Sequence, residues 1–108
     1  MKTEYVVIST TVDAEDKAAA LADSIVNEKL AACVQYMPIK SVYRWKGKVE
    51  SAGEQLVLAK TAASVAEKLV EFIKKTHSYD VPEIIVTPIV GGDDDYLKWI
   101  AAEVISDQ

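Results

Sequence analysis

The sequence predicts an α+β fold in which two helices cover one face of a four-stranded antiparallel sheet. Strand-like and helix-like patterns alternate in the order β-α-β-β-α-β, and a short last helix follows. The two prolines that fall within predicted strands are Pro38, in the second strand, and Pro88, in the fourth. This element order places the first and third strands at the centre, and the two prolines agree with edge positions for the other two strands, because proline cannot donate to a strand ladder. This is the arrangement of a ferredoxin-like sandwich.

The first strand is predicted over residues 5–12, which are apolar and β-branched almost without interruption, as is typical of a central strand. An amphipathic helix follows over about residues 14–29, because its apolar residues recur at helical spacing. These residues are Ala18, Leu21, Ala22 and Ile25. Asp13 is the predicted N-cap of this helix, ahead of acidic residues in its first turn.

A long hairpin from Val34 to Lys60 is predicted to supply the second and third strands. Its first strand covers residues 31–39 and continues over 41–45, and Lys46-Gly47-Lys48 forms the turn because glycine tolerates positive φ. The return strand is firm over residues 55–60, and Ala52-Gly53 predicts a bulge or irregularity before it.

The distal half of this hairpin, around Trp45 and Val49, extends beyond what the first and fourth strands can pair with. Unpaired strand edges and exposed aromatic side chains are costly unless another chain covers them. We therefore expect a homo-oligomer in which the hairpins pair between subunits.

A second helix is predicted over residues 64–75, with Thr61 or Ser64 as its cap. The fourth strand covers residues 83–89, and Gly91-Gly92 ends it. One of the three consecutive acids then caps the last helix. These acids are Asp93, Asp94 and Asp95.

The composition favours a single domain over residues 1–108, half of them apolar. Seventeen acidic against twelve basic residues give a formal charge of −5, which argues against nucleic-acid or anionic-membrane binding. A lone cysteine cannot form an intrachain disulfide, and the sequence shows neither a targeting segment nor a membrane span. We expect a cytoplasmic protein.

The only histidine, His77, lies where the second helix gives way to the fourth strand. It can be a metal ligand, a general base, or a structural residue bonded to the free carbonyls at the helix end. Cys33 is typical of a small thiol that packs as a hydrophobe. A soft metal site takes several nitrogen or sulfur ligands, and no spacing in one chain supplies them. No nucleophile–base pair is recognisable either, which disfavours an enzyme.

A small-ligand pocket between subunits is the remaining candidate site. Its residues are Tyr43, Trp45, Lys60, Tyr79 and Glu83. The alternative is interface packing, because aromatic residues are enriched at interfaces in any case. In the first interpretation, the corner after His77 forms one wall of a cleft that the Trp45 hairpin of a neighbour completes.

Five segments of the chain resemble the CutA divalent-cation-tolerance proteins, in that family's order. They are LAACV at 30–34, YRWKG at 43–47, LAKT at 58–61, HSYDVPEI at 77–84 and YLKWI at 96–100. The resemblance implies a ferredoxin-like subunit in a homotrimer similar to the PII signal-transduction proteins. It also implies a cytoplasmic protein of divalent-metal tolerance, copper above all, without established catalytic activity.

The resemblance further implies which residues form the site. His77 is the first metal ligand, with Cys33 or a carboxylate second, and the intersubunit cleft residues are Trp45, Lys60, Tyr79 and Glu83. Some family members carry a further cysteine and a second histidine where this chain has Thr10 and Thr76. Two soft candidate ligands are therefore missing here.

From these observations we expect a non-enzymatic homotrimer that binds copper, another divalent cation or a small ligand between subunits. The alternative is a PII-like regulatory scaffold that binds a small anion or nucleotide and a partner protein, which Lys60 and the long hairpin favour. A third interpretation is a structural trimer whose stable assembly is its main property.

Overall fold

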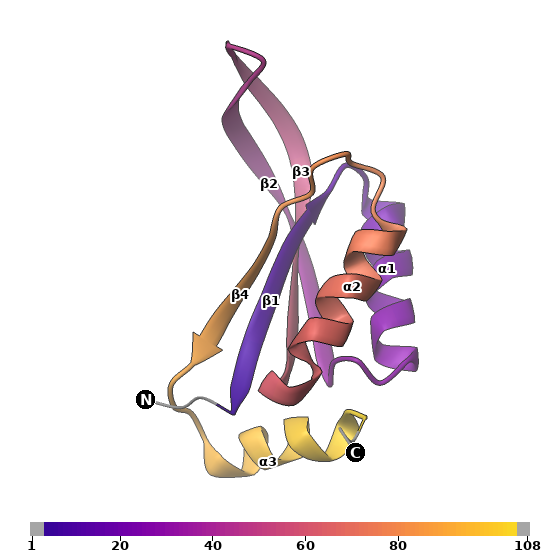
Figure 1. Cartoon of the computed structure of the whole chain (residues 1–108), viewed down its shortest axis with the longest axis vertical. Helices are drawn as coiled ribbons and strands as arrows, with labels where there is room; N and C mark the ends of the chain where they lie inside the picture. The colour runs from indigo at the N-terminus through magenta and orange to yellow at the C-terminus, as the bar shows by residue number, and fades with distance from the viewer. Residues whose placement is uncertain (1–3, 106–108) are drawn as a thin grey trace.

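Four strands form one antiparallel sheet in the order β2-β3-β1-β4. The computed structural model describes residues 4–105 and is shown in Figure 1. The strands are β1 (Tyr5–Val12), β2 (Cys33–Trp45), β3 (Lys48–Ala62) and β4 (Ile84–Ile89). The first and third strands lie at the centre, as predicted, and Pro38 and Pro88 fall in the two edge strands.

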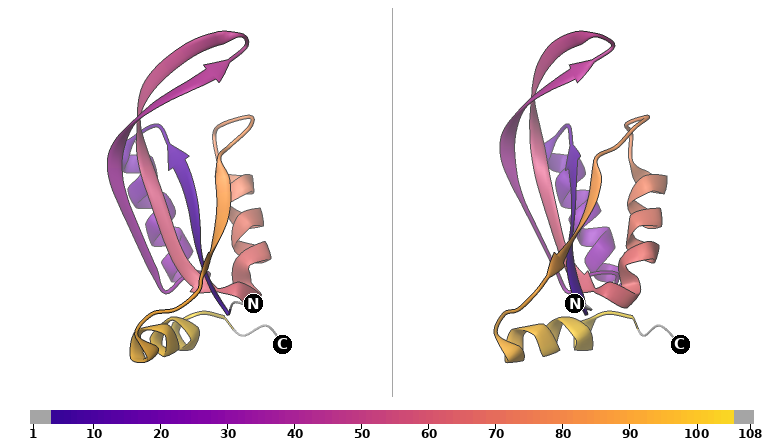
Figure 2. Two further views of the ribbon diagram at one scale, coloured as in Figure 1. Left: turned by 90° about the vertical axis from the view of Figure 1, so that its left-hand side faces the viewer. Right: turned by 60° about the vertical axis from the view of Figure 1, so that its left-hand side comes forward.

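Helices α1 (Glu15–Asn27) and α2 (Ala66–Thr76) lie side by side on one face of the sheet, and α3 (Asp94–Glu103) lies across one end (Figures 1 and 2). Alternate residues of β1 are buried because a strand points successive side chains to opposite faces. The core cluster joins β1 to both helices, and its members include Val6, Ile8, Ile25, Leu69 and Ile73. This is the predicted ferredoxin-like sandwich.

The predicted N-cap of α1 is wrong by one residue. Ala14 occupies the N-cap without a side-chain hydrogen bond. Asp13 lies one position too early to reach the first free amides, and its Oδ1 instead pairs with Lys17 Nζ at 2.8 Å. The hydrogen bond from Lys17 is the main reason why the pKa of Asp13 is lowered.

The start of α2 also differs from the prediction. A 3₁₀ turn over Ala63–Val65 precedes the helix, and Val65 is its N-cap, with no side-chain hydrogen bond. Ser64 lies within that turn. Thr61 is buried at the end of β3, and its hydroxyl donates to the carbonyl of Leu30 at 2.7 Å. The threonine therefore joins the sheet to the segment that follows α1, and it does not cap α2.

The predicted bulge at Ala52-Gly53 is absent, because Ala52 pairs with Ser41 and Gly53 with Lys40 in an unbroken register. The turn consists of Lys46 and Gly47, whose φ values of 51° and 79° are both positive. That combination is typical of the type I′ turn, whose twist matches the flanking strands.

Beyond the reach of β1, the hairpin continues as a two-stranded projection over residues 39–54, which we call the arm. β1 pairs with β3 only as far as Gln55, so the two strands of the arm pair only with each other. Figure 1 shows the arm extending past the end of the sheet. Val42 and Val49 are 69% and 68% exposed there. The predicted overextension is confirmed.

The last helix begins as predicted at an aspartate cap. The Asp93 carboxylate accepts a hydrogen bond from the Tyr96 amide at 3.0 Å, and Ile100 of the same helix is fully buried. Within residues 4–105, no helix has the length and apolar character that crossing a membrane requires.

Candidate functional site

The arm and the segment 78–83 border a cleft with a volume of about 810 Å³. Three of the four predicted cleft residues line it, namely Trp45, Tyr79 and Glu83. A single chain brings them together, since Trp45 comes from the chain's own arm and the other two from segment 78–83. The sequence placed this same arm on a neighbouring subunit.

The charge of the cleft is uniformly negative. Four carboxylates line it, from Glu50, Glu54, Asp80 and Glu83, and none of the described lining residues is Lys, Arg or His. Three aromatic side chains complete the walls, from Tyr43, Trp45 and Tyr79. Carboxylates and aromatic faces both attract positive charge, so the cleft favours a cation over an anion.

A hydrogen bond connects the two walls of the cleft. The Tyr79 hydroxyl donates to Glu54 Oε2 at 2.9 Å. The pKa of Tyr79 is raised well above its ordinary value, first by burial of the phenol and then by the bond to Glu54. Both effects penalise the phenolate, so Tyr79 is a neutral donor in this position.

His77 uses both of its ring nitrogens. Nε2 lies 2.7 Å from the carbonyl oxygen of Thr11, and Nδ1 lies 3.1 Å from the amide nitrogen of Tyr79. A carbonyl only accepts and an amide N–H only donates, so the proton is on Nε2 and Nδ1 accepts. The structural role suggested for His77, a bond to the free carbonyls at the end of α2, is therefore wrong. The carbonyl that His77 contacts belongs to Thr11 of β1.

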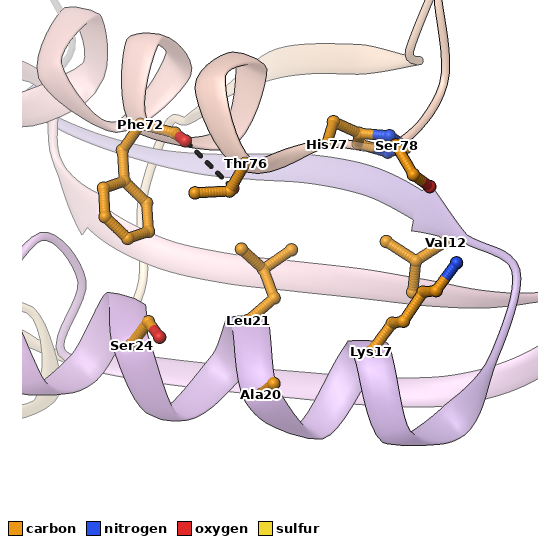
Figure 3. Close-up of a pocket in the computed structure, with 9 residues that line it drawn as sticks. All are labelled: Val12, Lys17, Ala20, Leu21, Ser24, Phe72, Thr76, His77 and Ser78. Atoms are coloured by element: carbon orange, nitrogen blue, oxygen red, sulfur yellow. Dashed lines mark hydrogen bonds between the residues drawn. The ribbon is translucent and has the colours of Figure 1, made fainter.

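A second and smaller cavity of about 290 Å³ lies between α1 and α2, and Figure 3 shows it. Leu21 and Phe72 face it from the two helices, and His77 and Ser78 close one end. The Thr76 hydroxyl donates back to the carbonyl of Phe72 at 3.0 Å. None of its described lining residues is acidic, so this cavity is a weaker candidate for binding a cation than the cleft.

Cys33 and Lys60, the two remaining predicted site residues, do not line the cleft. They pair with each other across β2 and β3, and Lys60 pairs with Val7 of β1. The position of Val7 is four residues from Thr11, which is roughly 13 Å along a strand. Lys60 Nζ lies 5.7 Å from the ring centroid of Tyr96 in α3. Within one chain, neither residue joins the cleft or approaches His77.

One chain does not supply a complete metal site. Among residues 4–105, no three His, Cys, Asp or Glu side chains come close enough together to hold a metal ion. His77 has no free lone pair while Tyr79 donates to Nδ1. Thr10 is fully buried and does not line the cleft.

Sequence reasoning missed Glu50 and Glu54, which supply half of the cleft carboxylates. Alternation along a regular strand places both on the same face of the arm, since they are four residues apart. That signal was hidden by the bulge predicted at Ala52-Gly53, because an inserted residue would have moved one of them to the other face.

Comparison with known proteins gives a consistent result. A family model described as CutA1 divalent ion tolerance protein matches residues 6–103. Divalent-cation tolerance protein CutA of Thermus thermophilus is 43% identical over 95 residues, 87% of this chain and 92% of that protein. Protein CutA, chloroplastic, of Arabidopsis thaliana is 50% identical over 96 residues, which are 88% of this chain and 53% of that protein. This chain thus spans about half the length of the plant relative.

Solved structures agree with the sequence matches. CutA1 from Oryza sativa superposes with a TM-score of 0.93 at 42% identity, covering 97% of each chain. The periplasmic divalent cation tolerance protein CutA from Archaeoglobus fulgidus gives a TM-score of 0.91 at 35% identity, covering 94% of this chain and 99% of that chain.

Proposed function

Because this chain belongs to the CutA1 divalent ion tolerance family, we propose that it is a non-enzymatic homotrimer of divalent-cation tolerance. Its ligand site is the cleft between the arm and segment 78–83, completed by a neighbouring subunit. The observation that carries this proposal is the cleft's charge, four carboxylates without a cationic side chain among the described lining residues. Such a lining attracts cations.

The arm supports the homotrimer in this proposal. Its two strands pair only with each other, and its apolar side chains are exposed. A projecting hairpin with free edges is stabilised when strands of another copy cover it. In this proposal a neighbouring subunit contributes the donors that the described residues of one chain do not bring together.

Copper is the cation first expected, with His77 as its first ligand and Cys33 or a carboxylate second. His77 does not itself line the cleft but lies next to it, bonded through Nδ1 to the amide of Tyr79, which does. The structure supports a carboxylate better than the cysteine of the same chain, because the cleft carboxylates adjoin Tyr79 whereas Cys33 lies near Lys60. Copper at Nδ1 of His77 has to displace the Tyr79 amide, which lowers the affinity that a free imidazole would provide.

Calorimetric titration with copper tests this proposal on the wild type, His77→Ala and Glu83→Gln. We expect heat in the wild type and a loss of affinity of at least about tenfold in both variants, typical of a disturbed metal site. Glu71→Gln, which changes an exposed carboxylate of α2 outside the cleft, is the matched control and binds as the wild type does. Identical negligible heats for all four proteins would end the copper proposal.

The second candidate is a PII-like scaffold that binds a small anion or nucleotide. The arguments for it are the long hairpin and the positive charge of Lys60. Lys60 lies away from the acidic cleft in one chain and would have to reach the site from another subunit. A thermal-shift screen with nucleotides and organic acids tests it, since a bound ligand raises the melting temperature by mass action. No shift at millimolar ligand contradicts the scaffold.

The cytoplasmic location is likewise part of the proposal, based on the lone cysteine, which cannot form an intrachain disulfide. Relatives named chloroplastic and periplasmic show that the compartment differs within the family. Fractionation of the native host, followed by immunodetection, decides it for this chain.

A further inference from the structure

We propose that His77 is a positioning residue of the cleft. As a neutral imidazole, it links segment 78–83 to β1 by hydrogen bonds and thereby orients the Tyr79 hydroxyl toward Glu54. These contacts define the shape of the cleft while no metal is bound to Nδ1 of His77, because copper at that nitrogen would displace the Tyr79 amide.

Segment 78–83 has no regular secondary structure of its own. It leaves α2 shortly after Thr76 and enters β4 at Ile84, and it supplies one wall of the cleft. A loop without ladder hydrogen bonds holds a defined shape only when side chains anchor it.

Three hydrogen bonds in series give the anchor. Nε2–H of His77 donates to the Thr11 carbonyl at 2.7 Å, and Nδ1 accepts from the Tyr79 amide at 3.1 Å. The Tyr79 hydroxyl then donates to Glu54 at 2.9 Å. The series runs from the last part of β1, through the imidazole, to the base of the arm.

The imidazole also contacts the Tyr79 side chain directly. The two ring centroids are 4.7 Å apart and the planes are tilted by 52°. His77 therefore restrains both the backbone and the ring of Tyr79, and the phenol is directed toward Glu54 as a result. With one tautomer satisfying an acceptor on one side and a donor on the other, the ring orientation is determined.

Two substitutions separate the two hydrogen bonds of the His77 ring, the one to the Thr11 carbonyl and the one from the Tyr79 amide. In His77→Asn, the side-chain oxygen is placed near the former Nδ1 and accepts from the amide two residues on, as in an Asx turn. In His77→Gln, the amide nitrogen is placed near the former Nε2 and donates to Thr11. His77→Ala removes both bonds.

The primary measurement is hydrogen exchange at the Tyr79 amide. One hydrogen bond changes exchange by about tenfold, so we expect that acceleration in His77→Ala and His77→Gln. His77→Asn stays within about threefold of the wild type. The amide of Ile8 in the core is the internal reference, because a general loss of stability would accelerate both amides in all three variants.

A second measurement uses the wild type alone, so it does not depend on variants that fold. Nitrogen NMR of the imidazole is expected to show the tautomer with its proton on Nε2 and a coupling from the Tyr79 amide to Nδ1. The proton on Nδ1 overturns the proposal. Equal Tyr79 exchange in His77→Asn and His77→Ala also overturns it, as does wild-type exchange in His77→Ala.

Discussion

Tyr79 donates a hydrogen bond from its hydroxyl to Oε2 of Glu54 at 2.9 Å, and this bond joins residues 25 positions apart in the chain. It connects the irregular segment after α2 to the base of the arm. The two walls of the acidic cleft are therefore linked directly, and the link has consequences that can be measured.

Because Tyr79 is partly buried and bonded to Glu54, the free energy of unfolding should fall as the pH becomes alkaline. The pKa of Tyr79 is raised in the folded protein, by burial first and by Glu54 second. Its contribution to stability is fully present below the ordinary phenol pKa and is lost as the pH rises from there toward the raised value. Chemical unfolding between about pH 8 and about pH 11 should show a smaller decline in Tyr79→Phe than in the wild type. Tyr36→Phe, at an exposed position outside the cleft, is the control and should decline as the wild type does.

Two buried threonines of the sheet should respond oppositely to the same substitution. Within residues 4–105, Thr10 Oγ1 is buried and has no hydrogen-bond partner, whereas Thr61 Oγ1 donates to Leu30. Thr10→Val removes an unsatisfied polar group and should raise the free energy of unfolding by about 1 kcal/mol. Thr61→Val leaves a buried carbonyl unpaired and should lower it by about 1–2 kcal/mol. Denaturant unfolding of the wild type and both variants measures these changes in the free energy of unfolding. A Thr10→Val variant that is less stable than the wild type contradicts the prediction.

Assembly should depend on the arm. Val49→Glu places a charge on an exposed apolar position of β3 and should weaken the homotrimer at least about tenfold, because a buried unpaired charge is costly in an interface. Light scattering over a dilution series reports the mass. Val26→Glu makes the same change at a 43% exposed position of α1 and should leave the mass unchanged. A wild-type monomer at micromolar concentration would rule out the trimer itself.

Copper affinity should distinguish the two ligands expected from the sequence. Cys33→Ser is expected to keep the wild-type affinity within about twofold, because Cys33 pairs with Lys60 roughly 13 Å along the sheet from the Thr11 level where His77 is anchored. His77→Ala is expected to lose copper affinity by at least about tenfold. Calorimetry on both variants makes the comparison. An equal loss in Cys33→Ser would mean that the cysteine of a neighbouring subunit completes the site.

Much of the fold could be predicted from local patterns. Residues 5–12 have the composition of a buried central strand, and Pro38 and Pro88 exclude the second and fourth strands from the centre. These signals depend on neighbours in the sequence, and the structure confirms them. The predicted caps of the first two helices failed by position. Asp13 lies one residue before the N-cap Ala14, and both Thr61 and Ser64 lie before the N-cap Val65, because a 3₁₀ turn delays the second helix.

Local patterns specify the order of the elements, the edge positions of the prolines and the excess length of the hairpin, because side-chain periodicity and proline chemistry act within a few residues. The partners of His77 and the composition of the cleft depend instead on long-range contacts. Thr11 is 66 residues from His77, and Glu54 is 25 from Tyr79. Such contacts depend on the register of the strands and on where a loop crosses them, and no local pattern contains that information.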